Sequence, residues 1–79
     1  MLQDFTGRVA VVTGAASGIG AALCAAFAAE GMSIVAGDID GDGAAATAAA
    51  LPRAVGVRVD VAEPDSVAAF ADTAFETYG

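Results

Sequence analysis

Hydrophobic and polar positions divide the chain into short β-branched runs and longer alanine-rich stretches. Residues 8–13 (RVAVVT) form such a run without polar alternation, which is typical of a strand that is covered on both faces in a parallel sheet. Residues 33–37 and 55–59 predict two further short strands, which are closed by Asp38 and Asp60 respectively.

A first helix is expected over residues 18–30, directly after the first strand. Ile19, Leu23 and Phe27 recur there every fourth residue, so we expect this face of the helix to meet the sheet. Gly31 fits as the C-terminal cap of this helix.

Two further helices are expected between and after the remaining strands. Residues 41–51 are alanine-rich, with Asp40 and Asp42 near the positive end of the helix. Pro64 suits the first turn of the last helix. One face of that last helix is lined by hydrophobic residues, and we expect them to pack on the sheet: Val67, Phe70, Ala71, Ala74 and Tyr78.

The expected order is βαβαβα, which indicates an α/β fold with parallel strands joined by helical crossovers. The right-handed crossover rule places the first two helices on one face of the sheet. In a doubly wound sheet of order 3-2-1-4-5-6, the third helix crosses back over the other face toward strand 4. The 79 residues therefore predict half of such a sheet, with strands 3-2-1 present and strand 4 onward missing.

Charge limits the partners that this chain can bind. Ten acidic residues face three arginines, with no lysine or histidine, and the net charge of −7 argues against a nucleic-acid partner. Any bound phosphate must therefore be held by backbone N–H groups and a helix dipole.

The single cysteine, Cys24, allows no intrachain disulfide, and its helical spacing among alanines predicts that it packs as a small hydrophobe. Residues 9–29 carry no charge, but glycines interrupt the run and alanine rather than leucine dominates it. Neither a signal peptide nor a spanning helix is therefore expected. We expect a soluble, cytoplasmic protein without a membrane partner.

A glycine-rich segment, TGAASGIG at residues 13–20, lies between the first predicted strand and the first predicted helix. This is the context that a dinucleotide-binding turn requires. Gly14 would allow the tight exit from the strand, Gly18 would let the backbone approach a pyrophosphate, and Gly20 would let the helix pack closely on the sheet. The N–H groups of residues 17–20 would then face the phosphates.

Two carboxylates follow the second and third strands, at the edge where open α/β sheets bind ligands. Asp38 lies 18 residues after Gly20, close to the spacing expected of the acid that accepts hydrogen bonds from the adenosine ribose. A carboxylate there would repel the extra phosphate of NADP. Ser17 and Ile39, the neighbours that we also expect at the cofactor, are not basic, so NAD is the expected cofactor. Asp38 could instead be a solvated turn residue, and Asp60 could serve a turn or a helix start.

These residues resemble the short-chain dehydrogenase/reductase (SDR) family, whose first turn reads TGxxxGxG and whose nucleotide domain is of the Rossmann type. Phe5 and Gly7 with the strand that follows resemble the start of that domain, so residues 1–79 are expected to be a partial NAD(P)-binding Rossmann domain. By resemblance, Asp60 and the Val61 backbone would contact the adenine, and Ser17 and Ile19 would contact the ribose and pyrophosphate.

The resemblance implies a parent enzyme that transfers a hydride between NAD and a small alcohol or carbonyl substrate, and that is a homo-oligomer. The family's Asn-Asn-Ala-Gly strand, catalytic Ser and Tyr-x-x-x-Lys pair are absent from these 79 residues, so no catalytic residue is assigned and the fragment alone is expected to be inactive. Alternatives are a fragment of an S-adenosylmethionine-dependent methyltransferase and a non-catalytic nucleotide-binding module. A P-loop is excluded by the missing lysine.

Overall fold

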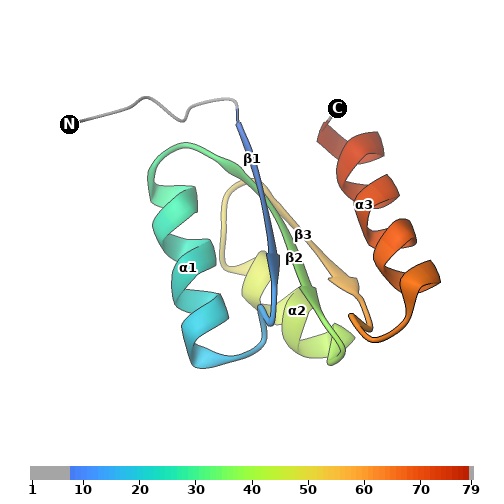
Figure 1. Cartoon of the computed structure of the whole chain (residues 1–79). Helices are drawn as coiled ribbons and strands as arrows, with labels where there is room; N and C mark the ends of the chain where they lie inside the picture. The colour runs from blue at the N-terminus through green and yellow to red at the C-terminus, as the bar shows by residue number, and fades with distance from the viewer. Residues whose placement is uncertain (1–7, 79) are drawn as a thin grey trace.

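The structure is a computed structural model that describes residues 8–78 (Figure 1). Phe5 and Gly7, which contribute to the family resemblance, lie outside the described residues. The elements alternate as expected, and their bounds are β1 Val9–Thr13, α1 Gly18–Ala29, β2 Ser33–Asp38, α2 Gly41–Ala49, β3 Ala54–Arg58 and α3 Pro64–Tyr78. Within this part of the chain, no helix combines the length and the apolar character that crossing a membrane requires.

The three strands form one parallel sheet in the order β1-β2-β3, which confirms the predicted topology. Val35 in the central strand pairs with Val11 of β1 and with Val55 of β3. The third strand starts and ends one residue earlier than expected, so Asp60 lies two residues beyond its end rather than directly at it.

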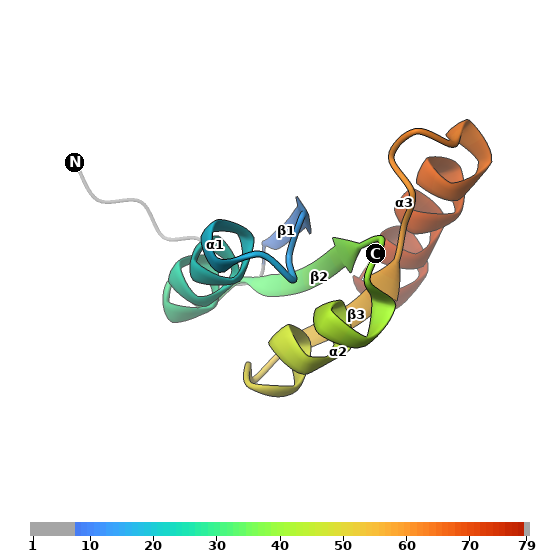
Figure 2. The same cartoon turned by 90° about the horizontal axis from the view of Figure 1, so that it is seen from below.

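Helices α1 and α2 cover one face of the sheet and α3 covers the other, as Figure 2 shows from below. This division follows from the alternation of side chains along the strands. One core cluster joins the sheet to α1 and α2 and contains Ala10, Val12, Ala15, Cys24, Ile34, Ala36 and Ala48. The other joins the sheet to α3 and contains Val35, Val59 and Phe70.

The face of α1 that meets the sheet is not the predicted one. Ile19 is 81% exposed and Leu23 is 45% exposed, whereas Gly20 and Cys24 are buried. Only Phe27 of the predicted face packs against the core. A row of small residues lets the helix axis come closer to the strands than a row of Ile and Leu would, and this close approach decides which face turns inward.

Cys24 is fully buried, which confirms that it packs as a small hydrophobe, and burial raises the pKa of its thiol. Tyr78 packs against the Phe70 cluster on α3, as expected of a residue on the helix face. Val67 and Ala71 are exposed on the same helix, although they were expected on its packed face, because no described strand covers the outer edge of β1 beside them.

The predicted cap at Gly31 is confirmed by its positive φ of 86°. The N–H of Gly31 donates to the carbonyl of Ala28 and the N–H of Met32 donates to the carbonyl of Phe27, at 3.0 and 3.2 Å. This pair of bonds is a Schellman motif, which ends α1 and turns the chain into β2.

Candidate functional site

The glycine-rich turn leaves β1 through Gly14, whose φ of 71° favours glycine. Ser17 is the N-cap of α1, because its hydroxyl accepts a hydrogen bond from the N–H of Gly20 at 3.1 Å. The same hydroxyl donates to the carbonyl of Gly14 at 2.7 Å. Both contacts of the Ser17 hydroxyl thus hold the turn together.

The two later glycines of the turn meet opposite surroundings. A Cβ atom on Gly20 would overlap the carbonyl oxygen of Gly14, so this position requires glycine for the helix to lie where it does. A Cβ on Gly18 would meet no atom within 4 Å. Ser17 accepts hydrogen bonds from the N–H groups of Gly20 and Ala21. Among residues 8–78, no acceptor is found for the N–H groups of Gly18 and Ile19 at the start of the helix.

Asp38, the last residue of β2, is hydrogen-bonded to the backbone on both carboxylate oxygens. Oδ2 accepts from the N–H of Ala16 in the glycine-rich turn, and Oδ1 accepts from the N–H of Asp40, each at 2.9 Å. Donation by Asp40 and then by Ala16 lowers the pKa of the Asp38 carboxyl, which is charged at neutral pH. Asp38 is therefore more than a solvated turn residue, because it joins the second strand to the glycine-rich turn.

Asp60 has a turn role in the loop after β3. Its Oδ1 accepts from the N–H of Ala62 at 3.0 Å, and its own N–H donates to the hydroxyl of Ser66 at 2.8 Å. The turn role that the sequence left open for Asp60 is thus present, and the residue also borders the cavity described next.

A cavity of about 360 Å³ lies at the carboxyl ends of the strands. Its lining comes from all three strand ends and comprises Thr13, Gly14, Asp38, Ile39, Val59, Asp60 and Val61. Five of the nine residues predicted to bind the cofactor line this cavity: Gly14, Asp38, Ile39, Asp60 and Val61. The other four are Ser17, the N-cap of α1, and Gly18, Ile19 and Gly20 in the first turn of that helix.

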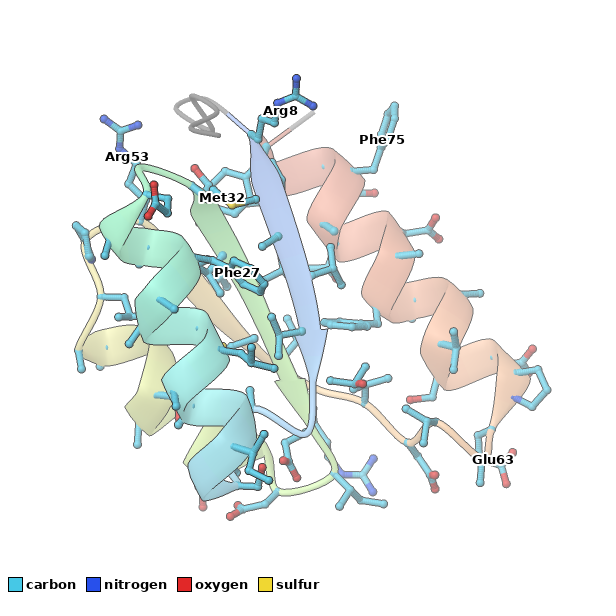
Figure 3. All side chains as sticks on the ribbon, turned by 60° about the vertical axis from the view of Figure 1, so that its left-hand side comes forward. Arg8, Phe27, Met32, Arg53, Glu63 and Phe75 are labelled. Carbon is cyan, nitrogen blue, oxygen red and sulfur yellow. The ribbon has the colours of Figure 1, made fainter. Side chains whose placement is uncertain are left out.

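The labelled arginines Arg8 and Arg53 lie at the amino-terminal end of the sheet, away from this cavity (Figure 3). Arg58 pairs in register with Asp38 but does not line the cavity. The site is therefore built from backbone N–H groups, carboxylates and apolar side chains, as the charge of the chain predicts.

Several contacts that support the site were not foreseen from the sequence. Thr47 on α2 donates its hydroxyl to the carbonyl of Ala15, and Ser66 accepts the N–H of Asp60. Gly37 leaves room for the ring of Phe70, because a Cβ atom on Gly37 would lie 2.6 Å from that ring. Thr47 had a visible signal, since it is the one polar residue in the alanine-rich run 44–50.

Comparison with known proteins identifies relatives over nearly the whole chain. The family described as short chain dehydrogenase matches residues 8–79. A cis-4-hydroxycyclohexanecarboxylate dehydrogenase of Sinomonas cyclohexanicum is 49% identical over the full chain, which covers 33% of that protein. A D-threitol dehydrogenase of Mycolicibacterium smegmatis is 47% identical over 92% of the chain, which covers 30% of that protein.

Solved structures agree with this assignment. A short-chain dehydrogenase/reductase from Burkholderia phymatum, determined in complex with NAD, has a TM-score of 0.90 and 41% identity over 99% of this chain and 29% of its own. The chain thus spans about a third of the length of the relatives it matches. The matches do not favour the methyltransferase alternative, and they confirm the Rossmann-type half-sheet. The chain belongs to the short-chain dehydrogenase family.

Proposed function

We propose that residues 1–79 form the part of an NAD-dependent dehydrogenase that binds the adenosine and pyrophosphate of the cofactor. The enzyme as a whole would transfer a hydride between NAD and an alcohol or carbonyl substrate. The observation that carries this proposal is the placement of a charged carboxylate, Asp38, at a cavity beside an open helix start.

The turn fits a pyrophosphate without any cationic side chain. The N–H groups of Gly18 and Ile19 and the positive end of α1 would face the phosphate oxygens. The open space at Gly18 is what a close approach of the cofactor to the backbone needs, since a side chain would occupy it.

Asp38 fits the ribose although each of its oxygens already accepts one N–H. A carboxylate oxygen has about two lone-pair sites, so each oxygen retains the capacity to accept one ribose hydroxyl. The adenine would then lie against Ile39, Asp60 and Val61 on the same cavity wall. Bound NAD would supply the hydride acceptor or donor, while these residues bind and orient its adenosine half.

No residue of this part is assigned a catalytic role, and by itself it is proposed to be inactive. We further propose that the intact enzyme is a cytoplasmic homo-oligomer with a small-molecule substrate, as the resemblance and the sequence pattern indicate. A non-catalytic nucleotide-binding role predicts the same binding without hydride transfer, so turnover of NAD by the full-length protein separates the two.

Calorimetry on the full-length protein tests the cofactor proposal. Two hydrogen bonds to the charged Asp38 support a preference for NAD over NADP of about a hundredfold or more. Asp38→Asn, which removes the charge, is expected to reduce this preference to within about tenfold. Asp42→Asn is the matched control, because Asp42 is exposed in the first turn of α2 and does not line the cavity. Tighter binding of NADP than of NAD by the unaltered protein would refute the proposal.

A further inference from the structure

We propose that Thr47 is a positioning residue for the cofactor-binding turn, although it does not line the cavity. This inference rests on the proposed NAD-binding function. Its hydroxyl donates to the carbonyl of Ala15 at 2.9 Å, across 32 residues of sequence. Ala15 is fully buried, so the hydroxyl supplies a partner to a carbonyl in an interior position.

The bond from Thr47 and the bond to Asp38 act on a single peptide group. The carbonyl of Ala15 and the N–H of Ala16 belong to the same planar unit. Thr47 holds its oxygen end, and Oδ2 of Asp38 holds its nitrogen end. Rotation of this peptide would break both bonds at once, so Thr47 fixes the direction from which Ala16 donates to the carboxylate.

The same segment is tied to β2 on its other side. The N–H of Ala15 donates to the carbonyl of Gly37 at 3.0 Å. The chain between Gly14 and Ser17 is therefore held by β2 and by α2 before α1 begins. These ties set where the N–H groups at the start of α1 point.

Two glycines bring α2 near enough for the Thr47 hydroxyl to reach the turn. A Cβ on Gly43 would lie 2.6 Å from the Cβ of Ala16, so the first turn of α2 touches the glycine-rich turn itself. A Cβ on Gly56 of β3 would lie 2.6 Å from the backbone of Ala45, so the helix lies close on the sheet. The close packing of α2 therefore serves the turn as well as the core.

Without the hydroxyl, the Ala15 carbonyl would be left in the interior without its donor. A buried carbonyl without a donor destabilises the native orientation of this peptide, so the N–H of Ala16 would be held less firmly toward Asp38. A carboxylate that loses this partner is less well oriented for the ribose, and the adjacent start of α1 loses its fixed direction. We therefore expect weaker NAD binding from a change outside the cavity.

The test measures the NAD affinity of the full-length protein by calorimetry and its stability by urea unfolding. Thr47→Val keeps the shape but removes the donor, and it is expected to raise the Kd for NAD about tenfold. Thr47→Ser restores a hydroxyl and is expected to stay within about threefold of the unaltered protein. If the Val variant does not fold, Thr47→Ala removes the same donor and carries the same expectation.

Two controls separate positioning from a general loss of stability. Thr73→Val removes a hydroxyl that donates to the Ala69 carbonyl within α3, and it is expected to leave NAD binding within about twofold. Ala48→Gly lowers the stability of α2 at a buried position while leaving the Thr47 hydroxyl in place, and it is also expected to leave NAD binding within about twofold.

Three results would overturn the role of Thr47 while leaving the proposed function intact. These are unchanged NAD binding by Thr47→Val, an equal loss in Thr47→Ser, or an equal loss in Ala48→Gly. Absence of NAD binding by the unaltered protein would instead contradict the proposed function itself, and this inference with it.

Discussion

Two neighbouring glycines of the turn should respond in opposite ways to the same change. Gly18 and Gly20 both lie in the first turn of α1, yet a Cβ on Gly18 meets open space and a Cβ on Gly20 overlaps the carbonyl oxygen of Gly14. Replacing each by alanine adds one methyl group in the same helix. The pair therefore separates the packing of the turn from its use as a binding surface.

The magnitudes follow from helix propensity and from steric overlap. Gly18→Ala should stabilise the fold by up to about 1 kcal/mol, because alanine is the better helix former and nothing obstructs its Cβ. Gly20→Ala must displace backbone, for which overpacking costs of about 1–3 kcal/mol are typical, so a net loss of stability is expected. NAD binding should fall in both variants, in Gly18→Ala because the methyl group occupies the space proposed for the pyrophosphate.

Urea unfolding and NAD calorimetry on the full-length protein measure the two effects separately. The expected result for Gly18→Ala is a midpoint at or above that of the unaltered protein, with NAD affinity at least about tenfold weaker. Unchanged NAD affinity in Gly18→Ala would refute the placement of the pyrophosphate at this backbone. Unchanged stability in Gly20→Ala would refute the argument from close approach to Gly14.

Three further outcomes test other parts of the structure. The pKa of Asp38 in the folded protein is lowered from its ordinary value of 3.8, so the stabilisation from its charged hydrogen bonds is complete above that value and is lost as the pH falls through the lowered pKa. NAD affinity should therefore stay constant from about pH 5 to 8. A change of NAD affinity in that window that Asp38→Asn removes would contradict this reasoning. Phe70→Ala should lower the free energy of unfolding by about 3–5 kcal/mol because the ring is buried between α3 and the sheet, and a loss below about 1 kcal/mol in urea would disprove this packing. Gly37→Ala should lower it by about 1–3 kcal/mol, since its Cβ would meet that ring, and a variant with an unchanged unfolding midpoint would show that the ring yields freely.

The order of elements could be read from the sequence because its signals are local. β-branched runs, helix caps and strand-end acids are signals that span only a few residues each. Together they predicted the parallel sheet, the cap at Gly31 and the position of Asp38, and the structure has all three. The inward face of α1 could not be read in this way. Hydrophobicity favours Ile19 and Leu23, but the depth to which a helix settles on a sheet depends on both surfaces, and here Gly20 and Cys24 allow the closer fit.

The contacts around the candidate site were only partly foreseeable, for a similar reason. The predicted strand at residues 33–37, together with the spacing from Gly20, placed Asp38 at the carboxyl end of β2, where it lies. The tie from Thr47 to Ala15 depends on how closely α2 approaches the turn, and that distance is set by Gly43 and Gly56 on two different elements. A glycine in the sequence is consistent with a close approach of another atom to its backbone, but the sequence does not show which atom that is.

The proposed function places an anionic cofactor beside a carboxylate in a chain whose net charge is −7, and the hydrogen bonds explain how this is tolerated. Both oxygens of Asp38 receive backbone N–H groups, so its charge is stabilised within the fold before any ligand arrives. In the proposed site, its further lone pairs would accept hydrogen bonds from uncharged ribose hydroxyls and would repel a phosphate in their place. Under the proposed function, a turn without lysine would gain its selectivity from a carboxylate that backbone N–H groups hold in place. Thr47 would support this arrangement through its hydrogen bond to the Ala15 carbonyl.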